Sequence, residues 1–544
     1  MKKSLSIFGK NFNNVAGIKA FGTDHAVNKY VFASEGEKHL YFYDYDGTVV
    51  ESFTVAEALA LTSLPDNPTH AGLTAQGWNW SLADIKTYLT DYPDADVNVG
   101  QMYITDDGKT RIYITLDDPE ALSPYLFLSL HGTISVDWGD NTDPDVISGS
   151  NMIFQKHTYS QIGDYVIAID VTSGNFGFSA NNNVNNVSCL TVTNGSGNNR
   201  RSQLYSNTIT KINIGHNVIL NKYAFNLCGK LKVVTIPSDI NEIGDYAFYN
   251  CHSIESITIP NEVTTIYTYL FSNCYLLKSV CIPFGIITIS HYPFQNCKSL
   301  KSITIPDSVT SIGNSAFISC YSLESIVIPD NVTSIGNYVF QNCYALPSIT
   351  IPNGLSAVSI SAFQNCNSLL SIDLPNTVTN IQNFAFQDCS ILRSINIPNV
   401  VTNIGMYAFK NCYKIQSIEI PNNVTSIGNY AFDNCWALQV IAIPDSVTSI
   451  GNNAFSYCYS LRSVVISENI VSIGNNAFAY CYSVAEYHFR SVTPPSLGSN
   501  AFTGIISGTI IYVPYSEDHS ILEAYKTATN WSSYASKMQE EPAP

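Results

Sequence analysis

Residues 300–320 read Leu-Lys-Ser-Ile-Thr-Ile-Pro-Asp-Ser-Val-Thr-Ser-Ile-Gly-Asn-Ser-Ala-Phe-Ile-Ser-Cys, and this unit decides the fold. Its phenylalanine and its cysteine recur twelve times at a constant interval of 23 residues, from Phe225 and Cys228 to Phe478 and Cys481. The central copies are Phe317, Cys320, Phe340, Cys343, Phe363 and Cys366. A fixed period of about 20 to 30 residues is typical of a solenoid, in which each unit buries its apolar face only against its neighbours.

Each unit predicts one short strand. Residues 302–305 alternate serine or threonine with isoleucine, so one face of the strand points inward. Pro306 has no N–H for the next ladder bond and ends the strand. Gly313 and its equivalents in other units are expected to supply a turn with positive φ. The fold class is therefore mainly β, with successive rungs paired as a parallel sheet ~4.8 Å apart.

The repeat is similar to the BspA-type leucine-rich repeat. The shared pattern is Leu-x-Ser-Ile-x-Ile-Pro-x-x-Val-Thr-x-Ile-Gly-x-x-Ala-Phe-x-x-Cys, which covers roughly 290 residues without a gap. We assign the solenoid to residues 187–515, including two weaker rungs at 187–192 and 209–214. Residues 516–544 resemble that family's C-terminal cap, with a last strand at 509–514 before it and a closing helix from Ile521 to Met538.

Residues 26–115 predict a small α+β domain. Asp46-Gly47 between two β-rich runs is a strong hairpin signal. Residues 54–61 and 81–89 are expected to form short helices, and Ser81 fits as the N-cap of the second. A second hairpin is expected within residues 102–115. Residues 1–25 are interpreted as an N-terminal attachment segment.

Residues 116–173 resemble the PKD-type immunoglobulin-like β-sandwich. The matching runs are Val136-Asp-Trp-Gly-Asp-Asn-Thr142, His157-Thr-Tyr159 and Gly163-Asp-Tyr-Val-Ile-Ala-Ile169. In that family the Trp packs inside the sandwich, the Gly-Asp pair forms a turn and the His-Thr-Tyr run begins a late strand. The resemblance implies a spacer or adhesive module. An Asn/Ser/Gly-rich stretch, 174–186, is expected to link it to the solenoid.

The composition narrows the classes of partner. The 544 residues carry a net charge of −17, and the first 200 hold 23 acidic against 11 basic residues. Such a chain disfavours binding to nucleic acid phosphates or to anionic membranes. It has no apolar run of about 18 residues, so no membrane insertion is expected. Met1–Lys10 starts with basic residues but lacks the apolar core of an ordinary secretory signal.

Twelve of the 14 cysteines belong to the repeat. Their Cβ vectors should run parallel from rung to rung, which is poor disulfide geometry. We therefore expect a ladder of buried thiols that fill one core position. A metal ladder is the alternative, but one cysteine per rung does not provide tetrahedral convergence.

The sequence gives little support to an enzymatic function. Asp44-Tyr45-Asp46-Gly47-Thr48 is similar to the nucleophile motif of haloacid-dehalogenase-like phosphatases, which implies catalysis through Asp44 and Asp46. The surrounding hairpins lack the βαβ units that such a Mg²⁺ site needs. Four loop acids, Asp137, Asp140, Asp143 and Asp145, are of a type that holds Ca²⁺ but are usually only solvated. We expect no enzyme, cofactor or metal.

Aromatic residues give the stronger functional signal. One stripe follows the repeat cysteine: Tyr275, Tyr321, Tyr344, Tyr413, Trp436, Tyr459 and Tyr482. A second stripe precedes the repeat phenylalanine by two residues: Tyr223, Tyr246, Tyr269, Tyr338, Tyr407 and Tyr430. Such rings either shield the rung edges or bind a partner, since tyrosine offers a large contact area with a polar tip. The sheet face is mostly Ser and Thr, with variants at Asp373, Asn396 and Glu419.

The sequence thus predicts a recognition or adhesion protein. A solenoid behind a spacer, without an ordinary export signal, resembles a bacteriophage fibre or receptor-binding protein on the virion surface. The expected partners are a host cell-surface protein or glycan and, through the N-terminal region, other virion proteins; a homo-oligomer is possible. The alternative is a BspA-like adhesin on a bacterial cell surface.

Overall fold

The computed structural model describes residues 6–7, 10–11, 38–119, 121–178, 189–193, 204–205 and 208–543. By its contacts the chain divides into two units, Met1–Glu37 and Lys38–Pro544. In the first unit, β1 (Ser6–Ile7) pairs antiparallel with β2 (Lys10–Asn11). The remainder of the predicted attachment segment, 1–25, lies outside the described residues, as does most of the predicted linker.

A four-stranded sheet and two helices form the α+β domain after Lys38. The sheet order is β4 (Val49–Phe53), β3 (Leu40–Tyr43), β6 (Val97–Thr105), β5 (Leu73–Trp78), and the helices are α1 (Val55–Ala60) and α2 (Leu82–Asp91). The β3–β4 hairpin at Asp46-Gly47 is confirmed. Both predicted helices are present, and Thr54 and Ser81 cap them by accepting backbone N–H bonds.

The second predicted hairpin is wrong. Asp107-Gly108 does make a tight turn, in which Gly108 donates its N–H to the Thr105 carbonyl at 3.0 Å. The strands on either side then diverge, because β6 pairs with β3 and β5 whereas β7 (Thr110–Leu116) pairs with β11 (Gly163–Phe178) and β14 (Ile209–Asn213). A local turn signal does not specify which strands become neighbours.

The predicted sandwich region is joined directly to the solenoid. β8 (Pro124–Asp137), β9 (Asp145–Gly149), β10 (Met152–Lys156), β12 (Leu190–Thr193) and β13 (Leu204–Tyr205) share one ten-stranded sheet with β7, β11, β14, β15 (Val218–Leu220) and β16 (Val233–Thr235). Residues 174–178, predicted as linker, are instead the end of β11, where Phe178 packs against Phe225. The predicted rung at 187–192 is also wrong, because Leu190 in β12 pairs antiparallel with β8.

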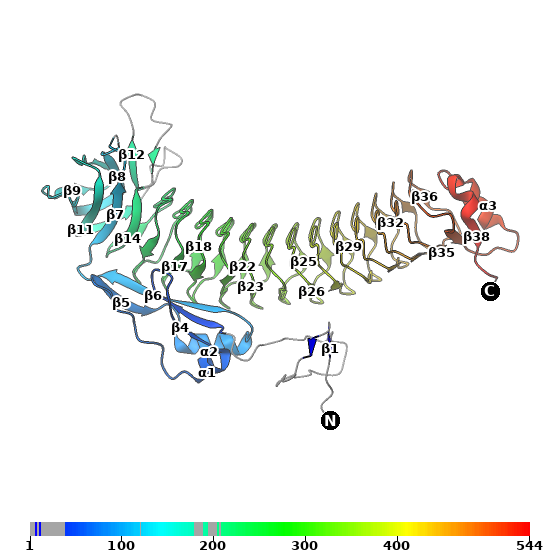
Figure 1. Cartoon of the computed structure of the whole chain (residues 1–544), viewed down its shortest axis with the longest axis horizontal. Helices are drawn as coiled ribbons and strands as arrows, with labels where there is room; N and C mark the ends of the chain where they lie inside the picture. Colours follow the sequence, from blue (N-terminus) through cyan, green and yellow to red (C-terminus); the bar gives the residue numbers. More distant parts are fainter. Residues whose placement is uncertain are drawn as a thin grey trace. The chain divides into compact units, whose positions relative to one another are not determined.

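The rungs stack side by side in one row (Figure 1), and two parallel ladders run through them. The first ladder holds the Ser-Ile-x-Ile strands: β14, β16, β17 (Ser256–Thr258), β19 (Ser279–Cys281), β21 (Ser302–Ile303), β23 (Ser325–Ile326), β26 (Ser371–Asp373), β28 (Ser394–Asn396), β31 (Val440–Ala442), β33 (Ser463–Ile466), β35 (Glu486–Phe489) and β37 (Ile510–Val513). The pairing of β14 with β16 confirms the weak rung at 209–214. These parallel pairs confirm the predicted fold class.

The second ladder follows the Val-Thr-Ser-Ile segment of each unit. Its strands are β15, β18 (Thr265–Ile266), β20 (Thr288–Ile289), β22 (Ser311–Ile312), β24 (Ser334–Ile335), β25 (Ala357–Val358), β27 (Asn380–Ile381), β29 (Asn403–Ile404), β30 (Ser426–Ile427), β32 (Ser449–Ile450), β34 (Ser472–Ile473) and β36 (Ser496–Leu497). The sheet of the sandwich region closes the N-terminal edge of both ladders, since β7 pairs with β14 and β11 pairs with β15. That edge is therefore not left open to unwanted strand pairing.

The repeat glycines do not adopt the predicted positive φ. Left-handed backbone occurs instead at the residue two before the repeat phenylalanine, such as Ser315, and at the residue before the repeat cysteine, such as Asn342. Glycine is needed for a different reason: a Cβ at Gly313 would lie 2.4 Å from the Ser290 carbonyl oxygen of the preceding rung. The glycines permit close approach between rungs.

One hydrophobic core extends from Ile112 to Met538, and the repeat Phe and Cys side chains lie inside it. Each phenylalanine stacks on the next, as Phe317 does on Phe340 at 5.6 Å between ring centroids. At the C-terminal end, β37 confirms the predicted last strand, whereas α3 (Ser520–Thr527) matches only the first part of the closing helix predicted from Ile521 to Met538. The chain then forms a 3₁₀ helix, Ser532–Lys537, and adds an unpredicted strand, β38 (Met538–Glu540), parallel to β37.

Candidate functional site

The stripe after the repeat cysteine forms two separate runs of rings. In the first, His252 stacks on Tyr275 at 4.6 Å and Tyr321 stacks on Tyr344 at 4.9 Å. Lys298 bridges the gap, since its ammonium lies 4.6 Å from the Tyr275 ring and 5.6 Å from the Tyr321 ring. The second run lies in the C-terminal part of the solenoid.

We call this second run the C-terminal aromatic patch: Tyr413, Trp436, Tyr459 and Tyr482, with Tyr457 and Tyr480 beside the last two. Trp436 is 44% exposed, Tyr459 38% and Tyr482 48%. Tyr457 and Tyr480 stand where most rungs have asparagine, on left-handed backbone. Each lies 6.1 Å from the neighbouring ring of the stripe, which widens the patch to two columns.

The rings of the patch are unevenly spaced, since Tyr413 lies 4.3 Å from Trp436 and the later pairs of the column are wider apart. Trp436 and Tyr459 are 5.9 Å apart between ring centroids, as are Tyr459 and Tyr482. Trp436, Tyr459 and Tyr482 are each more than a third exposed, so all three rings are accessible to a partner. Exposed aromatic clusters of this kind are enriched at recognition surfaces, because a partner gains large apolar contact at little entropy cost.

The second stripe has the opposite character. Its members are mostly half-buried, and Tyr407 stacks on Tyr430 at 4.8 Å with ring planes only 3° apart. Burial raises the pKa of Tyr246 to about 12. The ladder also includes Tyr292 and Phe384, which the sequence reading missed although the 23-residue period points to both. This geometry favours the shielding role for Tyr223, Tyr246, Tyr269, Tyr407 and Tyr430.

Tyr338 is an exception within the second stripe. Serines occupy the equivalent positions of the adjacent rungs, Ser315 and Ser361, so Tyr338 has no stacked partner of its stripe. It is 38% exposed, about as much as Tyr459. Tyr338 therefore provides a natural control, an exposed single ring outside the patch.

The outer face of the first ladder is only partly accessible. The α+β domain covers its early rungs, where the Tyr92 hydroxyl accepts the Asp330 N–H and Phe284 and Val327 pack against the core of that domain. The three variant positions of this face, Asp373, Asn396 and Glu419, lie beyond that contact and are exposed.

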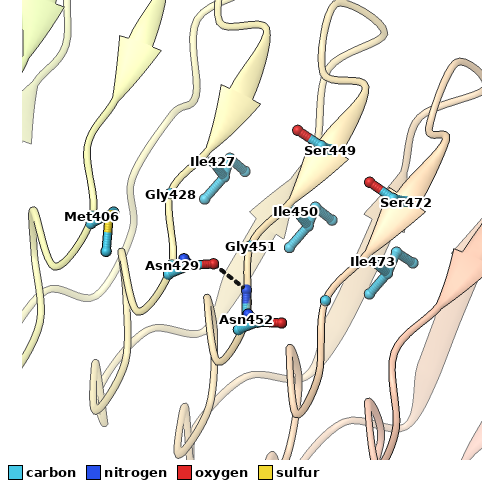
Figure 2. Close-up of a pocket in the computed structure, with 11 residues that line it drawn as sticks. Met406, Ile427, Gly428, Asn429, Ser449, Ile450, Gly451, Asn452, Ser472 and Ile473 are labelled. Carbon is cyan, nitrogen blue, oxygen red and sulfur yellow. Dashed lines mark hydrogen bonds between the residues drawn. The ribbon is translucent and has the colours of Figure 1, made fainter.

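A shallow hollow of about 350 Å³ lies on the second ladder (Figure 2). Figure 2 shows its repeated lining, in which Ile427, Ile450 and Ile473 line up and Ser449 and Ser472 present their hydroxyls. The Asn452 N–H donates to Asn429 Oδ1 at 2.7 Å. The lining is repeat structure, with no ionisable side chain among its residues.

The acidic candidates are engaged in structural bonds. Asp44 accepts the Tyr103 hydroxyl at 2.8 Å and contacts His70 Nε2 at 2.7 Å, whereas Asp46 accepts the Thr48 N–H of its own turn. Among the described residues, no group of three or more His, Cys, Asp or Glu side chains is arranged to hold a metal ion. The geometry gives no support to a phosphatase site at Asp44 and Asp46.

The PKD-type motif residues do come together. Trp138 is buried and stacks on His157 at 4.7 Å, and its indole N–H donates to Asp145. The Tyr159 hydroxyl donates to the Trp138 carbonyl at 2.9 Å. Residues 157–159 follow β10 as irregular chain and do not begin a strand as expected.

All 14 cysteines are buried, and the repeat cysteines from Cys251 to Cys481 are thiols outside any disulfide. From Cys251 onward each ladder thiol donates to the phenylalanine carbonyl of the preceding rung, as Cys412 does to Phe386 at 3.2 Å. Burial raises the pKa of the thiols of Cys366 and Cys412. They are poor nucleophiles and poor metal ligands in this state.

Comparison with known protein families identifies the family to which the repeat belongs. The family profile described as BspA type Leucine rich repeat region matches residues 166–278, 197–324, 266–392, 310–439 and 381–509. No curated protein matches. Across the described residues, no helix is long and apolar enough to cross a bilayer.

Solved structures of similar repeats come from several bacteria. A leucine-rich repeat protein from Bacteroides ovatus is 24% identical and the match covers 64% of this chain and 97% of that one, with a TM-score of 0.43. A leucine rich cell surface protein from Faecalibacterium prausnitzii is 27% identical over 55% of this chain and 86% of that one, with a TM-score of 0.36. The T. pallidum leucine rich repeat protein is 30% identical over 34% of this chain and 84% of that one, with a TM-score of 0.30.

Proposed function

Because the chain belongs to the BspA-type leucine-rich repeat family, whose profile matches more than half of it, we propose that it is a non-enzymatic recognition protein. The C-terminal aromatic patch is its binding site for a host cell-surface protein or glycan. One observation supports this site above the others: three rings of a single column, Trp436, Tyr459 and Tyr482, stay exposed in consecutive rungs. Among the tyrosines at the equivalent position of earlier rungs, Tyr344 is also exposed, at 39%, but it stacks on the half-buried Tyr321 and has no exposed aromatic ring at this position in the next rung.

The test is binding of the labelled full-length chain to a panel of bacterial cells, measured by flow cytometry. Replacing Trp436, Tyr459 and Tyr482 together by alanine should lower the affinity at least tenfold, since exposed aromatic anchors dominate interfaces. Tyr338→Ala is the matched control and should bind as the unmodified chain does. An equal loss in both variants, or a loss in neither, would refute the assignment.

We further propose that the protein is displayed on a phage virion as a fibre or receptor-binding protein, attached through its N-terminal region. The continuous core from the sandwich region to the C-terminal cap supports this, because it offers no flexible joint between the described parts. A bacterial cell surface is the alternative location. Immunogold labelling distinguishes the two, and label confined to cell envelopes would reject the virion.

The region 116–173 fits a PKD-like spacer in this proposal. Its motif cluster of Trp138, His157 and Tyr159 is internal, so it stabilises the module and leaves binding to the solenoid. Catalysis is not part of the proposed function. Mg²⁺-dependent phosphatase activity that disappears in Asp44→Asn would contradict this.

A further inference from the structure

A chain of hydrogen-bonded polar side chains leads to the C-terminal aromatic patch. It occupies the repeat position directly before the cysteine. Asn411 Nδ2 donates to Asp388 Oδ1 at 2.6 Å, and Asn434 Nδ2 donates to Asn411 Oδ1 at 3.0 Å. The indole Nε1 of Trp436 then donates to Asn434 Oδ1 at 3.3 Å. We call Asp388, Asn411 and Asn434 the polar relay, because they link Trp436 to a carboxylate two rungs earlier.

Two earlier relays occupy the same repeat position and run in the same direction, with each side chain donating to the preceding rung. Their bonds join Asn273 to Asn250 at 2.8 Å, Asn296 to Asn273 at 2.7 Å, Asn342 to Ser319 at 3.1 Å and Asn365 to Asn342 at 2.8 Å. Neither leads to an indole, because Lys298 and Asn367 stand where the polar relay has Trp436. Neither begins at a carboxylate. The polar relay therefore differs from the other two at both of its ends.

Asp388 determines the direction of the polar relay. A carboxylate only accepts hydrogen bonds, whereas an asparagine amide donates from one end and accepts at the other. Asn411 must therefore turn its nitrogen toward Asp388 and its oxygen toward Asn434. Asn434 is aligned in the same way, so its oxygen is left for the indole N–H, which only donates. With the opposite direction, two donors would face each other at Trp436.

The bond at the start of the polar relay is a firm one. It is charge-assisted, and at 2.6 Å it is shorter than the amide bonds of the other relays. Gln387 Nε2 donates to the second carboxylate oxygen of Asp388 at 2.8 Å, which fixes the carboxylate plane. The three relay side chains are half-buried, so water competes less for their bonds.

Trp436 depends on this bond because the core does not hold it. The residue is 44% exposed, and Tyr413 and Tyr459 contact its ring from the neighbouring rungs. An exposed side chain that is already ordered loses less conformational entropy when a partner binds. The orientation of the indole before binding therefore contributes to affinity.

We propose that Asp388 is a positioning residue of the aromatic patch: acting through Asn411 and Asn434, it holds the Trp436 indole in the orientation that binds the partner. This inference rests on the proposed function and deepens it, because it assigns part of the affinity to a side chain outside the patch. Asp388 acts through its hydrogen bond to Asn411 and not through its charge.

The first measurement is fluorine NMR of the full-length chain labelled with fluorotryptophan. The chain has five tryptophans, and the resonance that disappears in Trp436→Phe belongs to Trp436. Asp388→Ala should shift this resonance, whereas Asp388→Asn keeps an acceptor for Asn411 and should leave it in place. Asn342→Ala is the matched control, since it breaks the preceding relay at a residue with the same left-handed backbone, and it should not move the resonance.

The second measurement is the cell-binding assay of the proposed function. Asp388→Ala should lower the affinity roughly three- to tenfold, the effect of one lost hydrogen bond. Asp388→Gly removes the same acceptor on a backbone that tolerates positive φ and should have the same effect. Asp388→Asn and Asn342→Ala should bind as the unmodified chain does. In a Trp436→Phe background Asp388→Ala should cause no further loss, because the indole donor is gone.

Three results would overturn the inference. They are an unshifted Trp436 resonance in Asp388→Ala, an equal shift in Asp388→Asn, and a further loss of affinity from Asp388→Ala in the Trp436→Phe background. The second would mean that the carboxylate acts through its charge. The third would mean that Asp388 acts by a route other than the indole.

Failure of this inference is distinguishable from failure of the proposed function. If cells are bound through Trp436, Tyr459 and Tyr482 while Asp388→Ala binds as tightly as the unmodified chain, only the positioning role is rejected. If the unmodified chain binds no cell, the recognition function itself is rejected, and the positioning role in binding is rejected with it.

Discussion

Gly451→Ala should loosen the solenoid locally, and the structure shows why. A Cβ at position 451 would lie 2.5 Å from the Asn429 nitrogen, 2.7 Å from Asn429 Oδ1 and 2.7 Å from the Gly428 carbonyl carbon. Two of these three atoms are backbone, so no rotamer change relieves them. The two rungs must separate, or the hydrogen bond from the Asn452 N–H to Asn429 Oδ1 must break.

The expected cost combines three terms. Overpacking by one methyl group costs about 1–3 kcal/mol, and a lost hydrogen bond costs about 1 kcal/mol. Replacing glycine stiffens the unfolded chain, which returns about 0.4–1 kcal/mol. The local free energy of unfolding should therefore fall by about 1–4 kcal/mol. Gly508→Ala is the control, because nothing lies within 4 Å of its Cβ position.

Hydrogen exchange is the suitable assay, since a solenoid unfolds in segments and a single global transition is not assured. Peptides that cover residues 426–456 should lose protection in Gly451→Ala and keep it in Gly508→Ala. Gly451→Asn should be equally harmful, because the position needs space and not a left-handed backbone. Equal protection in the Gly451 and Gly508 variants, or rescue by asparagine, would refute the reasoning.

Three further predictions follow from burial, protonation and docking. Iodoacetamide at pH 8 should label none of the 14 cysteines in the folded chain, because all of them are buried and burial raises the pKa of Cys281, for example, to about 12. Mass spectrometry should show labelling only after denaturation. Burial lowers the pKa of His488, but its hydrogen bonds with Glu541 and Glu486 outweigh this and raise it above 6.5. Protonated His488 therefore stabilises β38 by under about 1 kcal/mol, fully below pH 6.5, and this contribution is lost as the pH rises through the raised pKa. Amide hydrogen exchange at residues 538–541, corrected for intrinsic rates, should become faster over the same pH range. The His488→Gln variant should not show this pH-dependent increase. Trp80→Phe removes the hydrogen-bond donor to the Ile282 carbonyl and should weaken docking of the α+β domain on the solenoid by about 1–2 kcal/mol. The measurement is amide hydrogen exchange in β6, which should become faster. Unchanged exchange would contradict the role given to this hydrogen bond.

Local and periodic features were predictable from the sequence. The interval between Phe317 and Phe340 predicted a parallel solenoid because a constant period allows only one kind of contact, each unit with its neighbours. Capping by Ser81 and the Asp46-Gly47 hairpin depend on a few adjacent residues and were also predicted correctly. Tyr292 and Phe384 stand at the same repeat position as the second aromatic stripe, but they were not among its predicted members.

The remaining features depend on contacts that do not repeat. The 23-residue pattern is the same at Ile282 and Ile397, yet Trp80, about 200 residues earlier in the chain, covers only the first. The prediction of a turn with positive φ at Gly451 was wrong because the local sequence does not show which rung packs against this glycine. The sequence by itself determined the stacked rungs with their buried Phe and Cys columns, whereas only the tertiary structure decided which ring columns and which part of the first ladder face solvent. The reason is that burial on this surface is set by pairings between distant segments, and no local pattern encodes them.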